Sequence, residues 1–109
     1  MNHDVIIVGS GAAGLSAAIT LARTHKVLVL AKGELTGGST AWAQGGIAAS
    51  LGNNTPDHWQ WHMYDTVKGS DWLGDTDAME YLAREAPKAV YELEHYGVPF
   101  SRTEEGDIY

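Results

Sequence analysis

Three glycines near the start of the chain, Gly9, Gly11 and Gly14, directly follow a short apolar run and have the spacing G-x-G-x-x-G. In a turn that binds a dinucleotide, the first glycine lets the chain leave a strand sharply and the second lets the backbone approach a pyrophosphate. The third lets the following helix pack closely on the strand. The N–H groups at the start of that helix then face the phosphates. The spacing predicts a dinucleotide-binding turn, and the alternative is an ordinary strand-to-helix turn.

A second group of candidate ligand contacts lies in residues 33–54, which are rich in glycine, alanine and small hydroxyl side chains. This stretch has no charge after Glu34 and is too apolar for a linker. Small residues let the backbone approach a flat ligand, and Ser39, Thr40 and Gln44 supply hydrogen bonds without net charge. We expect a ligand-binding loop, and the alternative is a tightly packed loop with glycine turns.

Between these two groups lies Lys32, at the end of a second apolar run. Dinucleotide sites often carry an acidic residue there, which holds the ribose hydroxyls of the adenosine. This chain has Ala31 and Lys32 at that point and Glu34 two positions later. Lys32 could reach the ribose or a phosphate oxygen instead, and the alternative is a solvated strand end.

Other polar side chains give weaker evidence for a functional site. His58 and His62 have the i, i+4 spacing of paired metal ligands, but nothing else in the sequence completes such a site. Asp71, Asp75 and Asp77 do not follow the spacing of a calcium loop, and helix capping accounts for two of them. We therefore predict no metal site and no catalytic residue within this chain.

The elements that must position these residues form a strand–helix–strand unit. Val5 to Val8 read as a buried strand, LSAAITLAR as a helix with one apolar face, and Lys26 to Ala31 as a second strand. Such a unit belongs to a parallel sheet. The sequence predicts an α/β fold of Rossmann type, with this unit and the ligand loop in residues 1–54 and a mainly helical segment in residues 55–109.

The helical segment is expected to contain three helices. The first has Thr55 or Asp57 as its N-cap, ends near Gly69 and carries an apolar stripe at i, i+4, i+8. The stripe consists of Trp59, Met63 and Val67.

Two more helices are predicted from capping and proline signals. Asp75 caps a helix that runs to about Glu85, and Pro87 opens another that stops at Gly97, as helix termini prefer. Residues 98–109 are expected to form a turn followed by a strand.

Composition limits the partners. Seven basic and fourteen acidic residues give a net charge of -7, which argues against nucleic acid or an anionic membrane surface. The chain has no cysteine, no signal peptide pattern and no run long enough to span a membrane, which is typical of a cytoplasmic protein. With 109 residues it is short for a complete dinucleotide-binding enzyme, so we expect further sequence or a partner subunit to complete the fold.

The stretches DVIIVGSGAAGLSAAITLA, VLVLAKG and GGSTAWAQGGIAA resemble the L-aspartate oxidase and succinate dehydrogenase–fumarate reductase flavoprotein family. Residues 4–50 are most similar to the FAD-binding start of L-aspartate oxidase, and residues 57–109 to the succinate dehydrogenase flavoprotein. The resemblance implies that Ser10 to Ala13 lie on the pyrophosphate of FAD, Lys32 on the adenosine side and Ser39 to Gly46 against the flavin half.

The candidate cofactor-binding residues combine both lines of reasoning. They are Gly9, Ser10, Gly11, Ala12, Ala13, Gly14, Lys32, Ser39, Thr40, Ala43, Gln44, Gly45 and Gly46. The succinate dehydrogenase pattern S-H-T-x-x-A-Q-G-G carries the histidine that links covalently to FAD at the position of Ser39. We therefore expect non-covalent FAD.

By this resemblance, the function is that of the FAD-binding segment of a flavoenzyme that oxidises a four-carbon dicarboxylate by hydride transfer to FAD. L-aspartate oxidation to iminoaspartate, a step of NAD biosynthesis, is preferred, and a succinate dehydrogenase or fumarate reductase flavoprotein subunit is the alternative. A nicotinamide-dependent dehydrogenase and a non-catalytic binding module are further alternatives. We expect residues 1–109 alone to be inactive.

Overall fold

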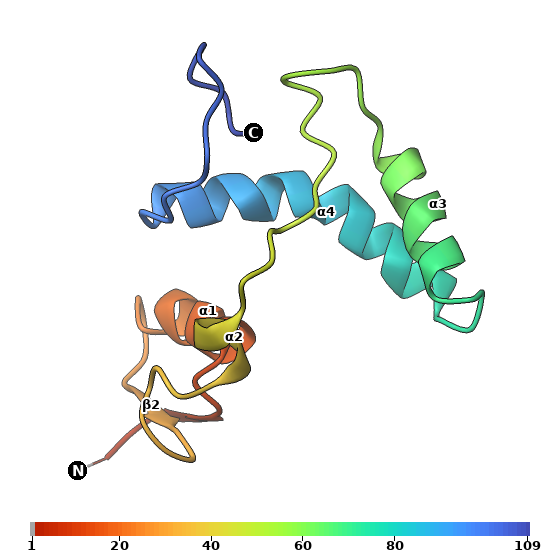
Figure 1. Cartoon of the computed structure of the whole chain (residues 1–109). Coiled ribbons are helices and arrows are strands. Elements are labelled where there is room, and N and C mark those ends of the chain that lie inside the picture. The colour runs from red at the N-terminus through yellow and green to blue at the C-terminus, as the bar shows by residue number, and fades with distance from the viewer. Residues whose placement is uncertain (1) are drawn as a thin grey trace. The chain divides into compact units, whose positions relative to one another are not determined.

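The computed structural model describes residues 2–109, and the chain divides into two compact units, Met1–Gly45 and Gly46–Tyr109 (Figure 1). The first unit has a short parallel sheet with helices, and the second is mainly helical. The predicted α/β fold is confirmed. The elements are β1 (Val5–Val8), α1 (Ala12–Leu21), β2 (Val27–Leu30), α2 (Ser39–Trp42), α3 (Trp59–Gly69) and α4 (Thr76–His95).

In the first unit, β1 and β2 form a two-stranded parallel sheet in which Val5 pairs with Val27 and Val8 with Leu30. Helix α1 connects the strands and packs against both of them. Directly before the paired residues, the Asp4 carboxylate accepts a hydrogen bond from the backbone N–H of Lys26 at 2.8 Å. The strand–helix–strand unit predicted from the glycine pattern is thus present.

One face of this sheet is open among the described residues. Ile6 is 59% exposed and Val8 84% exposed, although both are apolar strand residues. The buried core of the unit is small and contains Ala18, on α1. The sheet therefore positions the glycine turn through its backbone pairing and through α1 rather than through a large core.

In the second unit, α3 and α4 pack against each other, and Val67, Ala83 and Val90 are buried. The N-cap of α3 is His58, so the prediction of Thr55 or Asp57 was wrong. The Asp57 carboxylate accepts a hydrogen bond from the His58 N–H at 2.7 Å, which lies before the helix. This side chain is therefore occupied one residue too early to cap the first turn. The predicted end near Gly69 is confirmed.

Helix α4 is continuous, so the prediction of two helices separated at Pro87 was wrong (Figure 1). Proline has no N–H and removes one backbone hydrogen bond from a helix interior. Ala83 and Val90 lie seven residues apart, two turns along one face, and both are buried. Packing on both sides of the proline holds the two halves in one helix. The predicted cap is confirmed, because Asp75 accepts hydrogen bonds from the N–H groups of Asp77 and Ala78.

The segment after α4 forms a turn but no strand. Its pairing is a single antiparallel bridge between Arg102 and Ile108, so the predicted terminal strand was wrong. Gly106, with φ of 95°, turns the chain back before a longer ladder can form. The segment is held by Arg102, which pairs with Glu94 of α4. No helix in residues 2–109 combines the length and apolar character needed to cross a bilayer.

Candidate functional site

A pocket of about 610 Å³ lies in the first unit at the N-terminal end of α1, and we call it the α1 pocket. Three segments that are separate in the sequence meet there: the turn after β1, the residues after β2, and the loop that leads into α2. Most of the lining residues are glycines or carry polar side chains, so a ligand can approach the backbone closely. They are Gly9, Ser10, Gly11, Lys32, Gly33, Glu34, Gly37, Gly38, Ser39 and Thr40.

The glycine turn has a geometry that side chains would prevent at two positions. Gly9 has φ of 121°, a backbone conformation that L-residues rarely adopt, and its N–H donates to the carbonyl of Leu30 at 2.8 Å. A Cβ at Gly14 would overlap the carbonyl oxygen of Gly9 and lie 3.1 Å from its carbon. The first glycine therefore makes the turn, and the third allows the close approach of α1 to it.

The start of α1 lies beside the α1 pocket and carries free hydrogen-bond donors. Gly11 is the N-cap and has no side chain that could satisfy the first amides. The Ala12 N–H donates to the Thr40 hydroxyl at 3.2 Å. No hydrogen bond among the described residues engages the N–H groups of Ala13 and Gly14. Free amides and the positive end of the helix dipole together favour an anion such as a phosphate.

Two opposite charges line the α1 pocket. Lys32 lies just after β2 and Glu34 two residues later, and both side chains are exposed. Glu34 was not among the predicted site residues, although an acidic residue near the end of the second strand is the usual partner of ribose hydroxyls. The sequence does contain an acidic residue near the end of the second strand, but it lies two positions after Lys32, which stands where the acidic residue is expected.

The structure brings only part of the predicted site together. Gly9, Ser10, Gly11, Lys32, Ser39 and Thr40 line the α1 pocket, and Ala12 borders it through its bond to Thr40. The remaining predicted residues of the first unit do not line it. At Ala43 the backbone becomes extended and leaves α2, and Gly46 begins the second unit. The residues outside the pocket are Ala13, Gly14, Ala43, Gln44 and Gly45.

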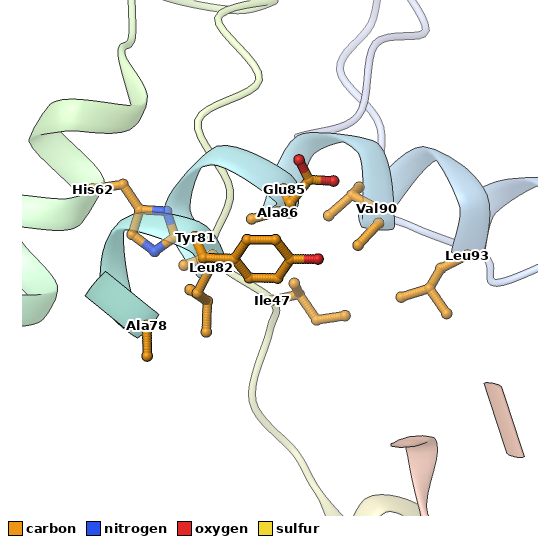
Figure 2. A pocket seen from close by; sticks show the side chains of 11 residues that line it. Ile47, His62, Ala78, Tyr81, Leu82, Glu85, Ala86, Val90 and Leu93 are labelled. Atoms are coloured by element: carbon orange, nitrogen blue, oxygen red, sulfur yellow. The ribbon is translucent and has the colours of Figure 1, made fainter. Parts of the chain in front are cut away.

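A second pocket, of about 620 Å³, lies along α4 in the second unit (Figure 2), and we call it the α4 groove. Its polar side chains include Glu85 and His62, whose buried Nδ1 has no hydrogen-bond partner among residues 2–109. Apart from the Tyr81 hydroxyl, the other lining side chains are apolar, so the groove offers a diphosphate few donors. The lining residues are Ile47, Ala48, His62, Ala78, Tyr81, Leu82, Glu85, Ala86, Ala89, Val90 and Leu93.

The two histidines with metal-ligand spacing are placed differently from each other. The His58 ring packs edge-on against Trp61, with the ring centroids 4.7 Å apart, while His62 lines the α4 groove. Residues 2–109 contain no cluster of three or more His, Asp or Glu side chains placed to hold a metal ion. Of the two pockets described above, the α1 pocket is the one beside free helix amides, which suit an anionic ligand.

Comparison with known proteins places the chain in a family. The family model described as "FAD binding domain" matches residues 4–109. The chain is 59% identical to the mitochondrial succinate dehydrogenase flavoprotein subunit of Oryza sativa over 109 residues, covering 99% of this chain and 17% of that protein. It is 61% identical to the succinate dehydrogenase flavoprotein subunit of Rickettsia bellii, covering 97% of this chain and 18% of that protein.

A relative from the other predicted branch is less similar. L-aspartate oxidase of Pseudomonas aeruginosa is 45% identical over 103 residues, covering 94% of this chain and 19% of that protein. Identity over the whole chain therefore favours succinate dehydrogenase, which corrects the preference for L-aspartate oxidase drawn from residues 4–50. The chain spans less than a fifth of the length of these relatives.

Solved structures agree with this assignment. The Mycobacterium smegmatis Sdh1 complex in the apo form contains a chain of similar fold, with a TM-score of 0.90 and 40% identity over 98% of this chain and 18% of that one. E. coli quinol fumarate reductase FrdA gives a TM-score of 0.89 and 35% identity, over 100% of this chain and 19% of that one. The predicted flavoprotein family is confirmed: the chain belongs to the FAD binding domain family.

Proposed function

We propose that the chain is the FAD-binding segment of a succinate dehydrogenase or fumarate reductase type of flavoprotein, which interconverts succinate and fumarate by hydride transfer involving FAD. The observation that carries this proposal is the identity of 59–61% to succinate dehydrogenase flavoprotein subunits along nearly the whole chain, against 45% to L-aspartate oxidase. Oxidation of L-aspartate is the second candidate, favoured by the resemblance of residues 4–50.

The α1 pocket fits the diphosphate part of FAD. The free N–H groups of Ala13 and Gly14, at the positive end of α1, would hold phosphate oxygens. Lys32 would add a cation on the adenosine side, and Glu34 would accept hydrogen bonds from ribose hydroxyls. When bound, FAD supplies the redox chemistry, while these residues bind and orient it.

We further propose that the flavin half lies against residues 39–46 and that FAD is held without a covalent bond. The non-covalent part of this proposal rests on Ser39, because a serine stands where the succinate dehydrogenase pattern has the histidine that links to FAD. Further subunits and a location in the cytoplasm or at the cytoplasmic face of a membrane belong to the same proposal. They rest on likeness to the family alone.

An absorption experiment tests cofactor binding and attachment together. The purified chain is mixed with FAD, freed of excess, and its visible spectrum is recorded before and after acid precipitation. We expect bound flavin that acid releases into the supernatant. Flavin that stays in the precipitate would contradict the non-covalent proposal, and a folded chain without flavin would contradict the site. The matched control is Gly9→Val, which should not bind, because valine is strained at φ of 121°.

Chimeras separate the two substrates. The chain replaces the matching segment in the Rickettsia bellii succinate dehydrogenase flavoprotein subunit and, in parallel, in Pseudomonas aeruginosa L-aspartate oxidase. We expect the first chimera to retain FAD and succinate oxidation and the second to lose activity with L-aspartate, because more of its packing contacts change. The reverse result would favour the aspartate oxidase branch.

A further inference from the structure

One side-chain hydrogen bond links residues 33–45 to the strands and helix of the first unit. Most hydrogen bonds of this segment are local, from the N–H of Gly37 to the Glu34 carbonyl and within the turn of α2. Among residues 2–109, the bond from the Ala12 N–H to the Thr40 hydroxyl is the only hydrogen bond that connects the segment to β1, α1 or β2. Thr40 therefore makes the hydrogen bond that joins one wall of the α1 pocket to the start of α1.

The bond between Ala12 and Thr40 lies at the edge of the α1 pocket, where helix α1 begins. Ala12 is the first residue of α1, so its amide is one of the donors that the helix itself cannot satisfy. The neighbouring N-cap is Gly11, and a Cβ there would lie 3.5 Å from the Thr40 hydroxyl oxygen. Gly11 and Thr40 both line the pocket. The contact thus joins the two sides of the cavity across 28 residues of sequence.

We propose that Thr40 is a positioning residue that closes the α1 pocket before FAD arrives: its hydroxyl binds the Ala12 amide and holds residues 33–45 against the start of α1. The cofactor part of this inference rests on the proposed function. A preformed pocket binds its ligand more tightly, because the loop is already ordered and loses less conformational entropy on binding. The amides of Ala13 and Gly14 stay free for the phosphates.

Threonine is well suited to this role. Its hydroxyl accepts the hydrogen bond from Ala12 and keeps one O–H donor for other partners, whereas valine, which has the same shape, can do neither. The branched Cβ restricts the first side-chain torsion angle, so less freedom is lost when the bond forms. Serine keeps the hydroxyl without the methyl group and is therefore the conservative variant.

Amide hydrogen exchange of the FAD-free chain tests the contact itself. We expect Thr40→Val to raise the exchange rate of the Ala12 amide by roughly three- to tenfold, while the Ala13 and Gly14 amides stay unchanged. Thr40→Ser should retain most of the protection. The matched control is Thr20→Val, which removes an exposed threonine hydroxyl that bonds within α1, at the carbonyl of Ser16. Unchanged Ala12 exchange in Thr40→Val would overturn the proposal.

FAD titration of the same variants tests the consequence. We expect Thr40→Val to weaken FAD binding by roughly three- to tenfold, with Thr40→Ser and Thr20→Val close to the unmodified chain. Faster Ala12 exchange with unchanged affinity would overturn the role of the contact in binding. If the unmodified chain itself fails to bind FAD while Ala12 is protected, the proposed function fails and the contact remains as a structural one.

Discussion

The α1 pocket and the α4 groove have nearly the same volume, about 610 and 620 Å³, but they differ in chemistry. The α1 pocket is lined by glycines, hydroxyls and two opposite charges. Helix α1 begins beside it, and the N–H groups of Ala13 and Gly14 have no hydrogen-bond partner among residues 2–109. The α4 groove is lined mainly by apolar side chains such as Leu82, Val90 and Leu93 (Figure 2). Volume therefore does not distinguish the two pockets, whereas the backbone donors beside the α1 pocket do.

The two regions also differ in the interactions that stabilise them. In the first unit, backbone contacts stabilise the glycine turn: Gly14 packs against the Gly9 carbonyl, and the Gly9 N–H donates to the Leu30 carbonyl. In the second unit, small buried side chains such as Ala83 hold α4 in place. An added methyl group should be most harmful in the first unit, and an added charge in the second.

The largest effect is expected for Gly14→Ala. The new Cβ would overlap the carbonyl oxygen of Gly9, and neither group is a flexible side chain that can move aside. We expect a loss of more than about 3 kcal/mol in the free energy of unfolding of the first unit and no detectable FAD binding. Urea unfolding and FAD titration measure the two quantities.

Gly69→Ala is the matched control for this variant. Gly69 ends α3, and a Cβ there would meet nothing within 4 Å. Alanine is also the better helix former, so the variant should be neutral or stabilised by up to about 1 kcal/mol. Equal destabilisation by both substitutions would show that the two regions do not differ in their tolerance of a methyl group.

A charge in the second unit should have the next largest effect. Ala83 is 0% exposed, so Ala83→Asp would bury a carboxylate without a partner. We expect the free energy of unfolding to fall by about 3 kcal/mol, measured from the loss of helical circular dichroism in urea. Ala89→Asp is the control, because Ala89 is exposed on the same helix. A similar loss in both variants would mean that helix propensity, rather than burial, sets the cost.

Local sequence signals predicted the parts of the molecule that local interactions determine. The apolar runs gave both strands, and the glycine spacing gave the turn in which Gly14 packs on Gly9. Asp75 was recognised as a cap because its partners lie two and three residues away. In each case the side chain or backbone group that explains the structure is a near neighbour in the sequence.

Contacts between distant residues were not predictable in this way. Helix α4 continues through Pro87 because Ala83 and Val90 are both buried, and burial depends on the rest of the fold. The Thr40 hydroxyl meets Ala12 across 28 residues, which no spacing rule describes. Likewise, the α1 pocket includes Glu34 because the loop folds back after β2.

Removal of a charge from the α1 pocket should have a smaller effect than either steric change. We expect Lys32→Met to weaken FAD binding by about five- to tenfold, because the variant loses the attraction between the lysine cation and the anionic cofactor. The loss is limited because water and salt screen an exposed charge. The difference from the unmodified chain should shrink as salt is added during the titration. Lys68→Met, on α3, is the control. If both variants bind equally weakly, the net charge of the chain matters more than the position of Lys32.

The smallest effect is expected at the cap of α4. Asp75 accepts hydrogen bonds from the Asp77 and Ala78 amides at 3.0 and 3.3 Å, so Asp75→Ala leaves both donors to water. We expect a loss of about 1 kcal/mol in the free energy of unfolding, and a smaller loss in Asp75→Asn, which keeps an accepting oxygen. FAD affinity should not change, since the cap serves the helical unit alone. A loss of FAD binding in Asp75→Ala would break the contrast between a region that binds by its backbone donors and a region that contributes stability.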